Sequence, residues 1–253
     1  MLARTVKSLT KRFGPDAYRW AKVARAGIGL FESGAAWAPR ECNICGYKGK
    51  FYPAGLPWGP ALRLDACCPN CDSFERHRLL QLWIDRNRRR IAGKSILHFA
   101  PEPSVTRFVR PEAGHYVTTD PDPSMKVDLR LDIENIALPD ASFDVVICAH
   151  VLEHVDDRAA LRGLRRIIKP GGLALIMIPM VDGWETTYEN PAIVAPKDRE
   201  LHFGQADHVR FYGRDVASRI VDAGFELVQF QASEPDISRY GLSRGETLFV
   251  ASV

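Results

Sequence analysis

The order of apolar and polar positions divides the larger part of the chain into strands and helices. Short apolar, β-branched runs are typical of strands buried in a sheet. Before residue 180 they cover residues 95–100, 115–120, 127–132, 144–149 and 173–178. Two later runs, residues 225–232 and 246–252, predict a closing hairpin. Helical periods separate most of the runs, so the pattern predicts an α/β fold with a mostly parallel sheet.

The clearest helical pattern follows the run 144–149. It begins at Asp156 and Asp157, places leucines and isoleucines on one face and arginines on the other, and stops at Lys169-Pro170-Gly171-Gly172. A further helix is expected over residues 214–223.

A connecting helix is expected over residues 74–94. The segment Asp72-Ser73-Phe74-Glu75 has the spacing of a capping box, and an apolar stripe continues to Arg90 before Gly93. Arg76, His77 and Arg78 occupy the first turn, where cations oppose the helix dipole. They face a neighbouring module, an anionic ligand or solvent.

Charge is distributed unevenly along the chain. Residues 1–95 contain 18 Lys and Arg against 7 Asp and Glu, whereas the whole chain has a net charge of only +3. Residues 1–40 form a basic arm with helical spacing. Such an arm can pack on the body of the protein, contact RNA, or lie on an anionic membrane surface. The sequence has neither a membrane-spanning run nor the apolar region of a signal peptide, so we expect a cytoplasmic protein.

Two C-x-x-C pairs predict a zinc-ribbon-like module over residues 41–73. Cys42 and Cys45 form the first pair, and Cys68 and Cys71 form the second after 22 intervening residues. Four thiolates close a tetrahedral site, so a zinc ion here would be structural. Free structural or redox thiols are the alternative, and Cys67 is an alternative to Cys68 as a ligand.

Polar side chains follow the run 144–149 directly. His150, Glu153 and His154 come just past its end. Open α/β sheets bind ligands beyond the carboxyl ends of their strands. The sequence therefore predicts a functional site at this edge.

The block from Asp132 through FDVVICAHVLEHV to Lys169-Pro170-Gly171-Gly172 resembles the class I S-adenosylmethionine-dependent methyltransferases, in particular the type 11 group. The resemblance covers residues 94–253 and is strongest over 132–179. It implies a Rossmann-like, seven-stranded, mostly parallel sheet with helices on both faces, formed here by residues 95–253.

The resemblance also implies a set of cofactor-binding positions. Asp120 would accept the ribose hydroxyls, and Asp132 with the backbone of Ile133 would read the adenine. The full set of expected S-adenosylmethionine contacts is Phe99, Ala100, Glu102, Asp120, Pro121, Asp132, Ile133, Ala149 and His150. The first turn departs from the family, because Ala100-Pro101-Glu102-Pro103-Ser104 contains no glycine. Glycine allows close backbone approach and positive φ, so the cofactor is either slightly displaced or lost.

Residues 180–213 form a long polar segment that is expected to contact substrate. It contains Trp184, Tyr188, His208, Arg210 and Tyr212, a concentration that ordinary loops lack. These residues favour a small-molecule or glycan acceptor methylated at oxygen or nitrogen. For a hydroxyl acceptor, His154 is the first candidate base and His150 the second. The alternatives are an RNA methyltransferase that uses the basic zinc-containing half, and a non-catalytic binding protein on the same scaffold.

Overall fold

The computed structural model describes residues 39–54 and 63–253. The predicted basic arm, residues 1–40, therefore lies almost wholly outside the described residues, and its role stays a prediction.

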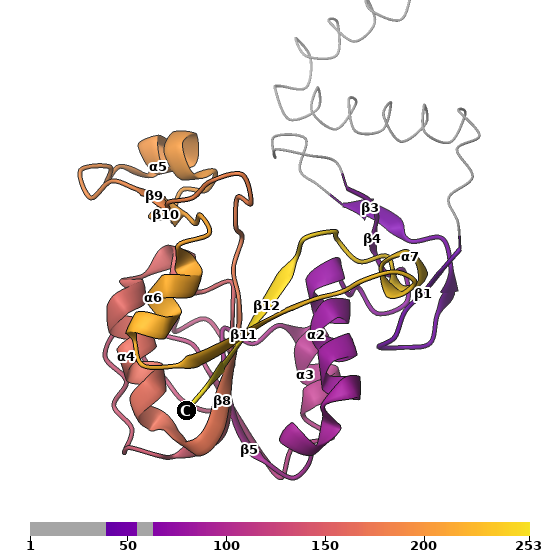
Figure 1. The fold of residues 1–253 in the computed structure, drawn as a ribbon, viewed down its shortest axis with the longest axis horizontal. Coiled ribbons are helices and arrows are strands. Elements are labelled where there is room, and N and C mark those ends of the chain that lie inside the picture. Colours follow the sequence, from indigo (N-terminus) through magenta and orange to yellow (C-terminus); the bar gives the residue numbers. More distant parts are fainter. Residues whose placement is uncertain (1–38, 55–62) are drawn as a thin grey trace, which may run out of the picture.

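A central six-stranded sheet organises the described part of the chain (Figure 1). Its strands, in spatial order, are β11 (Glu226–Gln231), β12 (Thr247–Ser252), β8 (Ile168–Met177), β7 (Phe143–Ala149), β5 (Ser95–Phe99) and β6 (His115–Thr119). Strands β8, β7, β5 and β6 are parallel, and β12 runs antiparallel to both β8 and β11. The predicted Rossmann-like fold and the antiparallel closing strand are confirmed.

The predicted strand over residues 127–132 is wrong. Within the described residues, this segment joins the sheet only through a single bridge between Thr119 and Leu129. The carboxylate of Asp128 accepts the N–H of Thr118 at 2.8 Å. In a strand ladder the Thr118 N–H would donate to a backbone carbonyl of the neighbouring strand, but here it donates to the Asp128 side chain. The described sheet therefore has six strands instead of the predicted seven.

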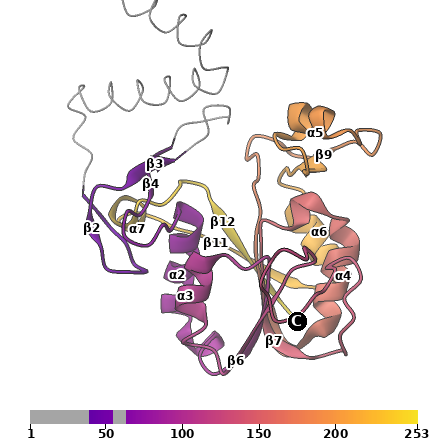
Figure 2. The same cartoon turned by 180° about the vertical axis from the view of Figure 1, so that it is seen from behind.

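Helices cover both faces of the sheet (Figure 2). One face packs on α2 (Glu75–Arg86) and α3 (Pro103–Val109), and the other packs on α4 (Asp157–Ile167) and α6 (Val216–Asp222). Along β7, Val145 and Ile147 contact the first layer, whereas Val146 and Cys148 contact the second. Strands buried on both sides explain the uninterrupted apolar runs in the sequence.

Two helix starts show how local sequence sets the element bounds. Asp156 caps α4, and its Oδ1 accepts the N–H groups of Arg158 and Ala159. Helix α2 begins later than the predicted capping box: Phe74 is the N-cap, and Nδ1 of His77 accepts the Phe74 N–H at 3.2 Å. Asp72 instead has a φ of 56°, within a tight turn. A short helix η1 (Arg88–Arg90) follows α2.

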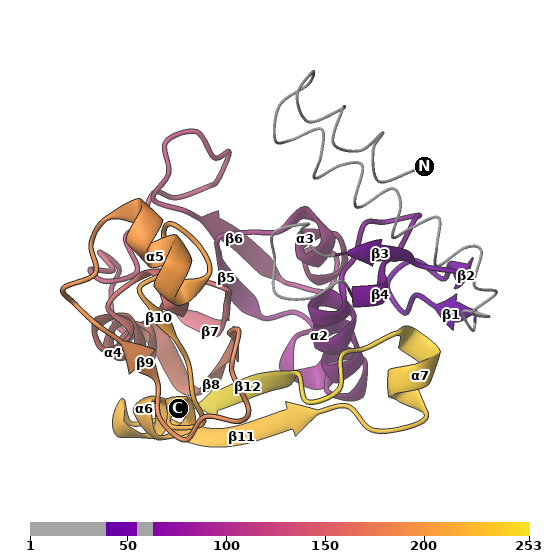
Figure 3. The same ribbon diagram turned by 90° about the horizontal axis from the view of Figure 1, so that it is seen from above.

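The cysteine-containing segment forms a small separate layer (Figure 3). It holds two antiparallel pairs, β1 (Arg40–Glu41) with β2 (Lys48–Gly49) and β3 (Tyr52–Ala54) with β4 (Arg63–Cys67). Helix α7 (Asp236–Tyr240), in the connection between β11 and β12, packs against β1. A segment close to the end of the chain thus contacts the start of the described residues.

The segment between β8 and α6 contains β9 (Tyr188–Glu189), α5 (Pro196–Phe203) and β10 (Arg210–Phe211), and β9 pairs with β10. A short helix η2 (Leu152–His154) follows β7. Within residues 39–54 and 63–253, every helix falls short of the length and apolarity needed to cross a bilayer.

Candidate functional site

The carboxyl ends of β5, β6 and β7 lie side by side. Phe99 pairs with Thr119 on one side and with Cys148 on the other. The residues that follow these strands, Ala100, Asp120 and His150, are therefore brought to one edge of the sheet. The strand register thus gathers the positions that the sequence predicted for a cofactor.

The glycine-free first turn adopts a left-handed conformation. Ala100 has a φ of 46°, and its N–H donates to the carbonyl of Thr119 at 2.9 Å. His150 at the end of β7 also has a positive φ, of 55°, and its N–H donates to Met177. A left-handed non-glycine residue costs roughly 1–2 kcal/mol. The chain accepts this cost twice at the same edge.

Glu102 is held by the first turn of α2. Its carboxylate accepts hydrogen bonds from Arg76 and from Nε2 of His77, the latter at 2.8 Å. Burial by itself raises the pKa of Glu102, but the hydrogen bonds from His77 and Arg76 outweigh it and hold that pKa well below its usual range. Two of the three basic side chains at the start of α2 therefore bind the first turn of the sheet domain.

The predicted nucleoside contacts follow β6 and the loop beside it. Oδ1 of Asp120 accepts the N–H of Asp122 at 2.8 Å, and Oδ2 has no donor among the described residues. Pro121 is exposed. Asp132 is exposed and accepts the N–H of Glu134, whereas the Ile133 side chain is buried in the core. These carboxylates remain able to accept hydrogen bonds from a ligand.

His150 and Glu153 face each other just past β7. Nδ1 of His150 lies 3.4 Å from Oε1 of Glu153, whose side chain is 1% exposed. Nε2 of His150 and Oε2 of Glu153 are both buried without a hydrogen-bond partner among the described residues. This edge of the sheet therefore contains two buried polar atoms that lack a hydrogen bond.

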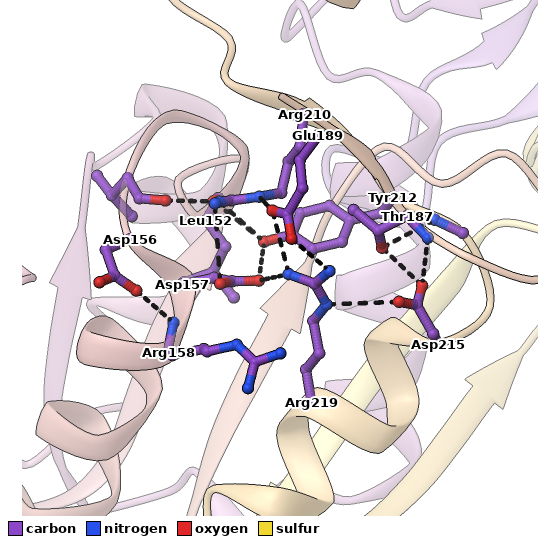
Figure 4. Close-up of polar contacts among 12 residues, drawn as sticks. Leu152, Asp156, Asp157, Arg158, Thr187, Glu189, Arg210, Tyr212, Asp215 and Arg219 are labelled. Atoms are coloured by element: carbon purple, nitrogen blue, oxygen red, sulfur yellow. Dashed lines mark hydrogen bonds and ion pairs between the residues drawn. The ribbon is translucent and has the colours of Figure 1, made fainter. Parts of the chain in front are cut away.

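Arg210 and Tyr212, predicted to contact substrate, lie in a buried polar network (Figure 4). The Tyr212 hydroxyl is fully buried and donates to Oδ2 of Asp157 at 2.8 Å. Arg210 donates to Glu189 at 2.9 Å and to the carbonyl of Leu152 at 2.8 Å. Their polar atoms are thus occupied by the protein itself, and the network ties β9 and β10 to the start of α4.

Trp184 and Tyr188 are accessible members of the same predicted set. They are 41% and 37% exposed and meet edge to face, with centroids 6.3 Å apart. The hydroxyl of Tyr188 pairs with Nδ1 of His202 at 2.7 Å. A role of these two rings in substrate binding stays a prediction.

His154 and His208 are neighbours. Their rings meet edge to face at 4.6 Å, and Nδ1 of His154 lies 3.3 Å from Oδ2 of Asp207. His208 is buried, and burial together with His154 lowers its pKa. The structure thus brings together two imidazoles that lie 54 positions apart in the sequence.

A cavity of about 380 Å³ opens beside His150, and we call it the acceptor cavity. Its walls come from the cysteine module, the start of α2, the end of β8 and the loop before β12. Six charged side chains line it: Arg63, Glu75, Arg76, Asp182, Arg244 and Glu246. Burial raises the pKa of Glu246, which the nearby His150 partly offsets. Of these residues, the sequence analysis had named Glu75, in the capping box, and Arg76, whereas the others lack a local pattern.

Four cysteine sulfurs gather at the base of the small module. The Sγ atoms of Cys42 and Cys71 are 3.6 Å apart, as are those of Cys45 and Cys68. A zinc ion about 2.3 Å from each sulfur requires sulfurs about 3.8 Å apart, so the spacing fits zinc. Within the described residues the cluster includes Cys68 and leaves out Cys67.

Arg78 joins this module to the rest of the protein. It is fully buried, and its guanidinium donates to the carbonyls of Ser73, Ala66, Tyr240 and Gly241. It also lies 4.6 Å from the centroid of the Phe51 ring. Of the three orientations that the sequence allowed, Arg78 faces the module.

Comparisons with known proteins match part of the chain to methyltransferases. Residues 104–176 match the family model described as a methyltransferase domain. Ubiquinone/menaquinone biosynthesis C-methyltransferases from Vibrio campbellii and Shewanella baltica are 28% and 30% identical over 122 and 116 residues. The matches cover 46% and 40% of this chain, which spans about half of each relative, 47% and 46%. The resemblance to class I S-adenosylmethionine-dependent methyltransferases is confirmed for this domain.

A solved S-adenosylmethionine-dependent methyltransferase from Mesorhizobium loti is 17% identical, with a TM-score of 0.46, and the match covers 68% of this chain and 96% of that one. We base the fold on the strand order of the chain itself.

Proposed function

We propose that this chain, whose residues 104–176 match the methyltransferase-domain family, transfers a methyl group from S-adenosylmethionine to a polar small molecule. One observation carries the proposal. His150 belongs both to the edge where the predicted cofactor contacts meet and to the lining of the acceptor cavity. A methyl donor over β5, β6 and β7 would therefore lie beside an acceptor in the cavity.

The residues at the edge fit the cofactor. S-adenosylmethionine, when bound, supplies an electrophilic methyl group on a sulfonium. Asp120, with its free Oδ2, would hold the ribose hydroxyls, and Asp132 with the Ile133 backbone would hold the adenine. The left-handed Ala100 lets the backbone approach the amino-acid part of the cofactor. Because Arg76 pairs with Glu102 and His77 hydrogen-bonds it, its carboxylate repels an anionic ligand group less strongly.

The lining of the acceptor cavity favours a polar acceptor. Charged side chains of both signs line the walls, and Arg63 comes from the cysteine module. The matched relatives are named for ubiquinone and menaquinone biosynthesis, and such an apolar acceptor would take these charged side chains out of water, although Arg63 and Glu75 pair with each other at 2.9 Å. We therefore propose a hydroxyl- or amine-bearing acceptor, such as a glycan unit, with the module as one wall of its site.

Two side chains of the cavity can accept the acceptor's proton. His150 has a free Nε2, and the raised pKa of the partly buried Glu246 makes it a stronger base than an ordinary carboxylate. S-adenosylmethionine, when bound, would supply the methyl group, and His150 or Glu246 would accept the hydroxyl proton of the acceptor. His154 is the alternative base.

The cysteine cluster is proposed to hold a structural zinc ion. Four sulfurs would fill its coordination sphere, so the ion supplies folding energy to the small module and leaves no position for substrate. Zinc analysis of the purified protein tests this, and Cys68→Ser should lose the metal whereas Cys67→Ser should retain it.

Calorimetry with S-adenosylhomocysteine tests the cofactor site. Asp120→Ala should raise the dissociation constant roughly 5- to 150-fold, equivalent to about 1–3 kcal/mol of lost charge-assisted hydrogen bonds. Asp122→Ala is the matched control, because it removes the same charge two positions away and keeps the backbone N–H that donates to Asp120. Equal effects of the two variants would refute the ribose assignment. Absence of heat with wild type at millimolar ligand would favour a non-catalytic binding protein.

The acceptor class is tested by methylation of polar small molecules and of RNA. Turnover that falls in Glu246→Gln, with cofactor affinity kept, supports the acceptor cavity. Methylation of RNA instead, with affinity that falls steeply as salt rises, would support the alternative in which the basic half binds RNA.

A further inference from the structure

A group of metal-binding side chains lies apart from the cysteine cluster. Glu153, His154 and His208 each offer one ligand atom, and these atoms lie within 4.8 Å of one another. Glu153 and His154 lie in η2, directly after β7, whereas His208 lies between α5 and β10. Two imidazoles and one carboxylate are a donor set that suits zinc and other divalent first-row transition metals.

Each imidazole has an acceptor group near its Nδ1, a hydrogen-bonded carbonyl for His208 and a carboxylate at ion-pair distance for His154. Nδ1 of His208 lies 3.2 Å from the carbonyl of Phe203, and Nδ1 of His154 lies 3.3 Å from the carboxylate of Asp207. When Nδ1 donates to such an acceptor, the lone pair remains on Nε2. Metal-binding histidines nearly always have this arrangement, in which one ring nitrogen binds an acceptor and the other binds the ion.

Glu153 provides an independent sign of a missing cation. Its side chain is 1% exposed, and Oε2 has no hydrogen-bond partner among the described residues. Oε1 faces His150 at 3.4 Å, so only the other oxygen remains free. A buried carboxylate oxygen without a partner is costly, and a bound cation removes that cost.

The backbone keeps these groups together. The N–H of Val209 donates to the carbonyl of Glu153 at 2.9 Å, which joins the segment carrying His208 to η2. A metal ion with bonds of about 2.1 Å requires ligand atoms about 3.4 Å apart in a tetrahedron. Because the ligand atoms already lie within 4.8 Å of one another, side-chain movements of roughly 1 Å would bring them to this separation.

We propose that Glu153, His154 and His208 bind a divalent transition metal, zinc by preference, at a second site beside β7. Three protein ligands leave one tetrahedral position open for water or for a polar group of the acceptor. The ion would tie the segment with α5 and β10 to the end of β7. His154, with Nε2 bound to metal, would then not act as the base.

Metal content of the purified full-length protein tests the proposal. His208→Gln should lose about one equivalent of zinc relative to wild type, and so should His154→Gln. His202→Gln is the matched control, because His202 is an exposed imidazole of the same segment outside the cluster, and it should keep the wild-type content. Equal zinc content in wild type and His208→Gln overturns the proposal.

A second measurement separates metal loss from misfolding. Added zinc should slow amide hydrogen exchange over residues 203–210 in metal-depleted wild type, and His208→Gln should show no such response while residues 143–149 stay protected in both. If amide protons throughout the sheet of His208→Gln exchange rapidly, the variant is unfolded. The milder Glu153→Gln is then tested in its place. If residues 203–210 of wild type exchange equally fast with and without added zinc, the proposal is also overturned.

Discussion

Replacing Arg78 with methionine should destabilise the whole chain, because this one side chain joins three parts of the structure. Its guanidinium donates to Ser73 before α2, to Ala66 in β4, and to Tyr240 and Gly241 after α7. Methionine keeps the apolar stem and leaves four carbonyls without their donor. The variant therefore removes the link between the cysteine module, α2 and the β11–β12 connection.

The size of the effect follows from opposing contributions. A hydrogen bond to a charged group contributes roughly 1.5–3 kcal/mol, so four of them set an upper limit well above the net value. Removal of the guanidinium also abolishes its desolvation cost, which amounts to several kcal/mol. Each buried carbonyl left without its donor costs roughly 1–3 kcal/mol, and after the desolvation gain is subtracted we expect Arg78→Met to cost about 3–5 kcal/mol. Arg78→Lys should lose roughly half as much, because one ammonium cannot reach carbonyls on several sides.

Urea denaturation followed by tryptophan fluorescence measures the loss, since Trp83 is buried in α2. Arg88→Met is the matched control: Arg88 is mostly exposed and pairs with Glu112 at the surface, so its loss should change the free energy of unfolding by less than about 1 kcal/mol. If Arg78→Met costs no more than this control, the carbonyl contacts do not stabilise the fold and the reasoning fails.

Three further predictions concern the same described residues. Tyr212→Phe should lower the free energy of unfolding by roughly 1–3 kcal/mol, because it removes the buried donor to Asp157, whereas Tyr47→Phe at an exposed hydrogen bond should cost less than about 0.5 kcal/mol in the same denaturation assay. Ala100→Gly should stabilise by up to about 1 kcal/mol, because relief of the left-handed strain exceeds the entropy that glycine adds to the unfolded chain; a lower melting temperature would contradict this. The pKa of Glu102 in the folded state lies below its unfolded value, so the Glu102 carboxylate stabilises the fold fully above about pH 5 and less as pH falls toward the folded pKa. Between about pH 5 and pH 2 the free energy of unfolding should therefore fall less in Glu102→Gln than in wild type. Parallel curves for the two proteins would refute the assignment.

Local sequence determined the elements whose signals lie within a few residues. The runs at β5, β6 and β7 are apolar and β-branched because both faces of these strands are buried, and such runs are visible without any tertiary knowledge. Asp156 predicted the start of α4 because a cap acts on N–H groups two and three positions ahead. The C-x-x-C spacing likewise indicated a four-thiolate cluster before its geometry was known.

Contacts with distant elements decide the surroundings of polar residues that the sequence assigned to a substrate. Arg210, Tyr212 and His208 looked like loop residues awaiting a substrate, but their partners at Asp157, Leu152 and Phe203 come from other elements. Only the fold shows whether such a group faces solvent or a buried partner. Residues 127–132 had strand composition, yet the Asp128 carboxylate competes for the donor of the neighbouring strand.

The sequence alone determined the α/β order, the likeness to methyltransferases and the cysteine pairs, because each depends on spacing along the chain. The tertiary structure alone decided that Cys68 joins the cluster, that Arg78 faces the module, and that a cavity opens beside His150. That cavity combines Arg63, Glu75, Met180 and Glu246, which are far apart in the chain and share no periodic pattern. Their meeting results from strand order and helix packing, and local patterns carry no information about either.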